Sequence, residues 1–163
     1  MPIGYPQAPP RSRWGRILSF APLIAVPVLI YNLIALFAGA APDGAVGMPP
    51  AQSALDGTVL NIAMLSGARL VLTWGDLLLV LAIVFLFAEV LKSTGTGAGA
   101  ITNHMLSMGL FVLCMIEFLL FANFATSVFF LMTAIVLLDA LAGMVVSIVS
   151  ARRDFGVGEG FNS

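Results

Sequence analysis

The chain has 163 residues, of which 60% are hydrophobic and only 9% are charged. An ordinary soluble domain carries roughly a quarter charged residues, so this composition excludes a soluble globular chain and predicts a small bundle of membrane spans. The formal net charge of -1, without a basic stripe, gives no reason to expect nucleic acid as a partner. The single cysteine, Cys114, lies in an apolar run, which excludes a disulfide framework.

The first apolar run covers residues 17–38 and follows a polar, proline-rich tail at residues 1–16. At 1.5 Å per residue the run spans about 33 Å, enough to cross the hydrocarbon core. Pro22 and Pro27 lie inside it and predict a kink. A cleaved signal peptide is the alternative, with a cleavage-like site at residues 38–40. Because the run exceeds the roughly 7–15 apolar residues of such peptides, we favour a retained anchor.

Residues 39–76 form the one substantial loop, which we expect on the outer side of the membrane. Prolines and glycines break structure in its first half. In its second half, two β-prone runs at residues 59–65 and 68–74 flank Ser66 and Gly67, a hairpin-turn signal. We therefore expect a short extracytoplasmic β-hairpin at the membrane surface, with an amphipathic interfacial segment as the alternative.

Three further apolar runs complete a predicted four-transmembrane-helix bundle, so the fold class is an all-α integral membrane protein. Asp76 stands directly before the second span, where its carboxylate is expected to cap the positive end of the helix. The predicted membrane domain is 17–150, followed by a cytoplasmic tail at 151–163. Its last three spans are expected at residues 77–92, 101–123 and 128–150.

The basic residues fix the predicted orientation of this bundle. Cytoplasmic loops carry an excess of Lys and Arg, and six of the seven basic residues fall on one side if the N-terminus is inside. Only Arg69 falls on the outer side. We therefore expect both termini in the cytoplasm. The six inner residues are Arg11, Arg13, Arg16, Lys92, Arg152 and Arg153.

Four short stretches resemble those of small, uncharacterised four-span inner-membrane proteins of proteobacteria. The resemblance covers roughly residues 60–154 and implies a bacterial inner (cytoplasmic) membrane and a four-span architecture. That family has no assigned activity, so the resemblance implies no functional residues. The stretches are Ser66-Gly67-Ala68, Gly75-Asp76-Leu77-Leu78, Glu89-Val90-Leu91-Lys92 and Ala151-Arg152-Arg153-Asp154.

Asp139 lies near the middle of the fourth predicted span. An ionisable group there costs about 2.5–3.5 kcal/mol even on a lenient insertion scale, so it is by default a functional hypothesis. Gly143, Ser147 and Ala151 follow at intervals of four residues, and such a stripe of small residues lets another helix approach closely. We expect the stripe to face the bundle interior, with Asp139 protonated and hydrogen-bonded. A proton or cation relay is the functional alternative.

Glu117 is the acid of the third predicted span. Counted from the turn near residue 125, it lies about 12 Å below the outer end and Asp139 about 21 Å below, so the two are not expected to touch. Asn32 on the first span has a depth comparable with that of Glu117 and is its expected partner. Two acids at staggered depths mark either a proton path or two separate polar contacts, and we favour the second.

Motifs for catalysis or metal binding are absent from the sequence. His104 is the only histidine, and no CxxC, HExxH or carboxylate–histidine cluster of metal-ligand spacing occurs. Glu89 and His104 flank the short inner loop, where we expect a surface pair of little energetic weight. We therefore expect no metal, no cofactor and no enzyme activity.

Two functions from different classes remain. The first is a non-catalytic accessory or structural subunit that docks on a larger membrane protein complex through helix packing. Its partners are the lipid bilayer and other membrane-protein subunits, or further copies of itself. The alternative is a small oligomeric proton or cation transporter or channel that uses Glu117 and Asp139. The small size and the missing motifs favour the subunit.

Overall fold

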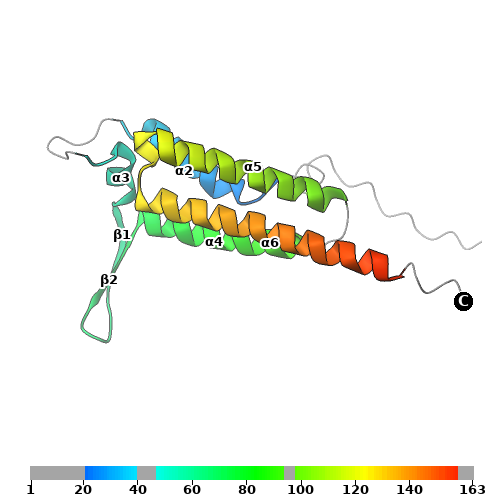
Figure 1. Cartoon of the computed structure of the whole chain (residues 1–163). Helices are drawn as coiled ribbons and strands as arrows, with labels where there is room; N and C mark the ends of the chain where they lie inside the picture. The colour runs from blue at the N-terminus through cyan, green and yellow to red at the C-terminus, as the bar shows by residue number, and fades with distance from the viewer. Residues whose placement is uncertain (1–20, 40–46, 94–97, 158–163) are drawn as a thin grey trace, which may run out of the picture.

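The computed structural model describes residues 21–39, 47–93 and 98–157, and these are mostly helical (Figure 1). Three of the described helices are long and apolar enough to cross a membrane, which marks a membrane protein. The end of the bundle that carries a small β-hairpin is called the outer end, after the predicted orientation, and the opposite end the inner end. The candidate spans are Trp74–Lys92, Thr102–Leu120 and Ser127–Val146.

The first described helix, α2 (Ala25–Phe37), has 13 residues and is about 20 Å long, shorter than a hydrocarbon core. The two prolines mark its beginning and do not kink it. Pro22 lies before the helix, where its carbonyl accepts the N–H of Ala25 at 3.1 Å. Pro27 lies in the first turn, where the missing N–H costs nothing. The tail predicted at 1–16 and the first residues of the predicted span, 17–20, lie outside the described residues.

A short helix, α3 (Pro50–Leu55), stands in the half of the outer loop where the sequence predicted only breakers. Pro50 is the first helical residue, a position where the fixed φ of proline favours a helix start. Ala51 and Leu55 are buried, and α3 packs against α2 and the start of the next helix. The prolines of this loop therefore begin a helix that closes the outer end of the bundle.

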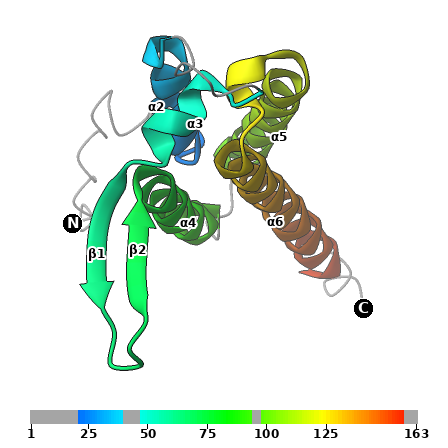
Figure 2. The same cartoon turned by 90° about the vertical axis from the view of Figure 1, so that its left-hand side faces the viewer.

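The predicted β-hairpin is confirmed, and the interfacial-helix alternative does not form. Strand β1 (Thr58–Ala63) pairs antiparallel with β2 (Arg69–Thr73). Gly67 has a φ of 85° in the turn, a conformation that glycine adopts without strain, and its N–H donates to Met64 at 3.0 Å. The hairpin leaves the outer end across the helix axes (Figures 1 and 2), and β1 is exposed along its whole length.

Helix α4 (Trp74–Ser93) begins three residues before the predicted second span, and its N-cap is Thr73 instead of Asp76. The Asp76 carboxylate accepts both the N–H and the hydroxyl of Thr73 at 2.8 Å. In return the Asp76 N–H donates to Thr73 Oγ1 at 3.2 Å. This reciprocal pair is a capping box. Asp76 therefore does act at the positive end of α4, but from inside the first turn.

The last two long helices differ from the predicted spans mainly at their ends. Helix α5 (Ala98–Leu120) stops three residues early and is followed by the 3-10 turn η1 (Ala122–Phe124). Helix α6 (Ser127–Val157) continues past the predicted stop at residues 152 and 153. Arginine is a good helix former and favours the C-terminal end of the helix dipole, so it does not end a helix. The end of the predicted tail, 158–163, lies outside the described residues.

Neighbouring helices among those described pack along one another, except that α2 and α5 make few contacts. Helix α6 packs along both α4 and α5, and α2 packs on α4, whereas α2 and α5 touch at few places. A view down the axes shows α2 and α4 on one side and α5 and α6 on the other (Figure 2). The largest fully buried apolar side chains are Tyr31, Phe129, Ile24, Leu55, Met132, Val28 and Val136.

Candidate functional site

Polar side chains between the helices gather in two clusters, one near each end of the bundle. The outer cluster centres on Tyr31, which is fully buried in α2. Its hydroxyl lies 2.6 Å from Thr126 Oγ1 and donates to the carbonyl of Asn123 at 3.1 Å. Asn123 in turn donates to the carbonyl of Ala35 at 2.9 Å. These bonds tie α2 to the connection between α5 and α6.

The outer cluster follows from local capping and aromatic packing. Thr126 precedes α6, and its Oγ1 accepts the N–H of Phe129 at 3.1 Å, as an N-cap does. The Tyr31 ring lies against Phe129, with 4.6 Å between ring centroids, and against Phe124, with 5.6 Å. Ring pairs at these separations are favourable beyond their burial. The aromatic side chains therefore fix the Tyr31 hydroxyl at the cap of α6.

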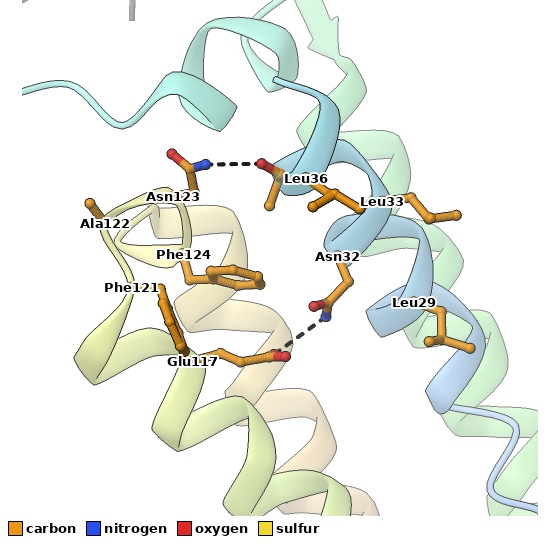
Figure 3. Close-up of a pocket in the computed structure, with 10 residues that line it drawn as sticks. Leu29, Asn32, Leu33, Leu36, Glu117, Phe121, Ala122, Asn123 and Phe124 are labelled. Carbon is orange, nitrogen blue, oxygen red and sulfur yellow. Dashed lines mark hydrogen bonds between the residues drawn. The ribbon is translucent and has the colours of Figure 1, made fainter. Parts of the chain in front are cut away.

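Below this cluster, a groove of about 740 Å³ opens between α2 and α5 (Figure 3). Leu29, Leu33 and Leu36 form its wall on α2, and each is more than half exposed. Glu117 on α5 and Phe121, the residue directly after α5, form the facing wall. The groove is therefore an open, mainly apolar surface with one carboxyl group in it.

The Glu117 carboxyl has a weak partner within this groove. Asn32 Nδ2 donates to Glu117 Oε2 at 3.3 Å, which is the pairing that helix depth predicted, and also to the carbonyl of Val28 at 3.1 Å. Both side chains are only half-buried. A long bond from a shared amide leaves Glu117 with unused hydrogen-bonding capacity at an apolar surface.

The inner cluster joins the segment before α2 to α4 and α5 through a lysine and a buried glutamate. Lys92 Nζ donates to the carbonyl of Ala21 at 2.6 Å, to Asn103 Oδ1 at 3.0 Å and to Glu89 Oε1 at 3.2 Å. Glu89 also accepts the N–H of Leu23 at 2.6 Å and a bond from Asn103 Nδ2. The three donors of Lys92 and both oxygens of Glu89 thus have partners.

This arrangement corrects the expectation for Glu89. Its side chain is 1% exposed, so the predicted surface pair with His104 does not form. The sequence did hold a signal: Glu89 and Lys92 are three residues apart on one helix face, and Asn103 and Ser107 are four apart on the next helix. The spacing places each pair on one face of its own helix, but it does not show that the two faces meet. The sequence does not predict the clasp formed by Glu89, Lys92 and Asn103, because its members lie on different helices and no single run defines which helix faces meet.

Asp139 lies deeper, between α5 and α6, and not beside Glu117. It is 4% exposed and interacts with Ser107 and His104 on α5 and with Glu89 and Lys92 on α4. Three buried atoms here have no hydrogen-bond partner among the described residues: Asp139 Oδ2, Ser107 Oγ and His104 Nε2. Ser107 is near the Asp139 carboxyl, but no direct bond satisfies these atoms. The site is therefore polar, ionisable and incompletely bonded.

At Gly143, the predicted stripe of small residues is in contact with another helix of the same chain. A Cβ at this position would overlap the imidazole ring of His104, so the missing side chain is what lets the ring pack on α6. Ser147 and Ala151 continue α6, but their side chains lie outside the described part of the chain. At Gly143 the stripe therefore packs against α5 of the same chain, and the helix of a partner protein cannot occupy this position.

Within the described ranges, no three His, Cys, Asp or Glu side chains gather so that they could hold a metal ion. The comparisons with known proteins add no constraint on the two clusters. No family model, curated protein or solved structure matches the chain.

Proposed function

We propose that the protein is a non-catalytic accessory or structural subunit that docks on a larger membrane protein complex by helix packing. We further propose that it is a four-span protein of the bacterial inner membrane, with α2 as part of the first span and both termini in the cytoplasm. The docking surface is the groove between α2 and α5, and the bound group is a transmembrane helix of the partner. The observation that carries this proposal is Glu117 in the groove wall.

The chemistry of the groove favours a helix over lipid chains. A charged or polar group that faces hydrocarbon without partners costs on the order of 2 kcal/mol or more. Lipid tails cannot donate to the free lone pairs of Glu117, whereas Ser, Thr, Asn or His on a partner helix can, as in other helix contacts within membranes. The half-exposed leucines Leu33 and Leu36 provide the apolar part of the same contact.

Crosslinking in native membranes tests this proposal. A photoreactive residue placed at Leu33, which is 55% exposed in the groove, is expected to give one discrete adduct with another membrane protein. The matched control is Leu138 on α6, 56% exposed and outside the groove, where only lipid adducts are expected. Glu117→Leu should reduce the Leu33 adduct several-fold. Lipid adducts alone at both positions would refute the docking surface, and an adduct with a second copy of this chain would favour the transporter instead.

A small oligomeric proton or cation transporter is the second candidate, and the buried, incompletely bonded carboxyl of Asp139 favours it. Against it, Glu117 lies in the groove and Asp139 lies near the inner cluster, and each has its own neighbours. Flux measurements in proteoliposomes separate the candidates. Under the subunit proposal, vesicles that contain the unaltered protein are no more permeable to protons or cations than empty vesicles. Glu117→Gln and Asp139→Asn then leave this permeability unchanged.

A further inference from the structure

Ser107 and His104 on α5 lie near Asp139 on α6, and each of these three side chains has a buried polar atom without a hydrogen-bond partner within the described residues. Ser107 is fully buried and Asp139 is 4% exposed. His104 and Ser107 lie three residues apart on α5 and therefore share a face. The atoms are chemically complementary, because a hydroxyl donates and accepts, a carboxylate oxygen accepts, and an imidazole nitrogen does one or the other.

Leaving three such atoms unpaired is expensive. Each unsatisfied buried group costs about 1–3 kcal/mol, so the burial of three such atoms in neighbouring side chains requires a partner. A buried water typically makes about three hydrogen bonds to groups of this kind, and it bridges groups that interact without touching. A metal cation fits less well, since Lys92 already places a positive charge near Asp139 and the described ligands are too few.

We propose that Ser107, His104 and Asp139 bind one buried water molecule, through which Asp139 takes up and releases a proton on the inner side of the membrane. On uptake, a hydronium ion at the site transfers its proton to Asp139 Oδ2, an O–H bond forms, and a water molecule remains. On release the same bond breaks and the proton returns to water. This site does not use the groove or Glu117, so it is independent of the docking proposal.

Asp139 has ionisable neighbours on both helices that pack along α6. The ionisable groups near Asp139 are Glu89 and Lys92 on α4 and His104 on α5. Glu89 and Lys92 form an ion pair at 3.2 Å, and both also interact with Asp139. The partly exposed Lys92 side chain lies at the inner end and interacts with Asp139, and we therefore assign the exchange of the proton to that side.

Infrared difference spectroscopy of the full chain in lipid vesicles, titrated with pH, tests the proposal. The unaltered protein is expected to show one carboxylic-acid carbonyl band that appears and disappears with pH. Asp139→Asn should abolish this band. Ser107→Ala should shift its frequency, and His104→Gln should move its pH midpoint. Glu117→Gln, in the groove, should leave both unchanged. A pH-independent spectrum overturns the proposal. So does a band whose frequency is unchanged in Ser107→Ala and whose pH midpoint is unchanged in His104→Gln.

The water itself has a separate readout that needs no variant. Exchange into water labelled with oxygen-18 should shift one sharp O–H stretching band of a weakly coupled internal water, and titration of the carboxyl should change that band. If Ser107→Ala fails to fold, this measurement on the unaltered protein decides. A spectrum without an isotope-sensitive internal O–H band refutes the water site.

Discussion

The two polar clusters hold the same helix, α2, but with different chemistry. At the outer end, Tyr31, Thr126 and Asn123 are neutral, and their bonds run to one another and to backbone carbonyls. At the inner end, the ionisable Glu89 and Lys92 hold the start of α2, and Asp139 and His104 lie beside them. The outer cluster is bonded through neutral groups, while the inner one retains three unpartnered atoms among the described residues.

Because of this difference, the contacts of the outer cluster are independent of pH, whereas those of the inner cluster can change with pH. Neutral hydroxyls and amides keep the same hydrogen bonds at any ordinary pH, so the outer cluster holds one geometry. Ionisable groups away from water change their bonds with every proton gained or lost. The inner end is therefore where the state of the protein can depend on conditions, and where substitutions should have the larger effects.

The largest effect is expected for Glu89→Leu. The change leaves Lys92, Asn103 and the N–H of Leu23 without their common acceptor. Removal of one partner from a buried pair typically costs about 3 kcal/mol or more. We expect a loss of about 3 kcal/mol in the free energy of unfolding, measured by equilibrium unfolding in detergent micelles.

Glu89→Gln is the control for this substitution. The amide keeps an oxygen acceptor and the shape of the side chain, so the loss should be about half as large or less, near 1.5 kcal/mol for one charge-assisted bond. Equal losses in Glu89→Gln and Glu89→Leu would show that charge and not bonding holds the inner cluster. No loss in either would contradict the role of Glu89 as a clasp.

A smaller effect, about 1–3 kcal/mol, is expected for Gly143→Ala, because its new Cβ must displace the His104 ring. Gly109→Ala on α5 is the matched control. A Cβ there meets nothing within 4 Å, so the substitution should be neutral or stabilise by up to about 1 kcal/mol through helix propensity. The two variants compared by thermal unfolding should move in opposite directions. A shared direction would mean that His104 does not pack on Gly143.

Long-range hydrophobic patterning made part of this fold predictable. Runs of about 20 apolar residues mark helices reliably, and a Ser-Gly turn between β-prone runs marked the hairpin. Helix ends were less accurate, because capping depends on local competition. Thr73 takes the cap position before Asp76, and Pro50 begins a helix where proline was read as a breaker. Both outcomes follow from known first-turn preferences of these residues.

Contacts between residues on different helices were predictable only where the depth of each residue below the outer end was enough to pair them. Asn32 and Glu117 were paired from their distances below the outer end, and they are hydrogen-bonded. The inner cluster was not found, because its members come from three helices and the start of α2, and the angular order of the helices is not encoded in any single run. Gly143 shows the same limit: its spacing predicted a close contact, but not that His104 makes it.

The smallest effect is expected at the outer cluster, for Tyr31→Phe. The ring keeps its contacts with Phe124 and Phe129, and only the hydroxyl is lost. The hydroxyl makes two neutral hydrogen bonds, to Thr126 and to the carbonyl of Asn123, and such bonds contribute as little as about 0.5 kcal/mol each. Asn123 still holds the carbonyl of Ala35. We therefore expect a loss of about 1 kcal/mol that stays constant between pH 5 and pH 8 in unfolding experiments. The loss from Asp139→Asn should vary over the same range, since it removes an ionisable group. If the Tyr31→Phe loss varied with pH, or exceeded that of Glu89→Leu, the outer cluster would be the responsive one and the contrast between the two ends would be reversed.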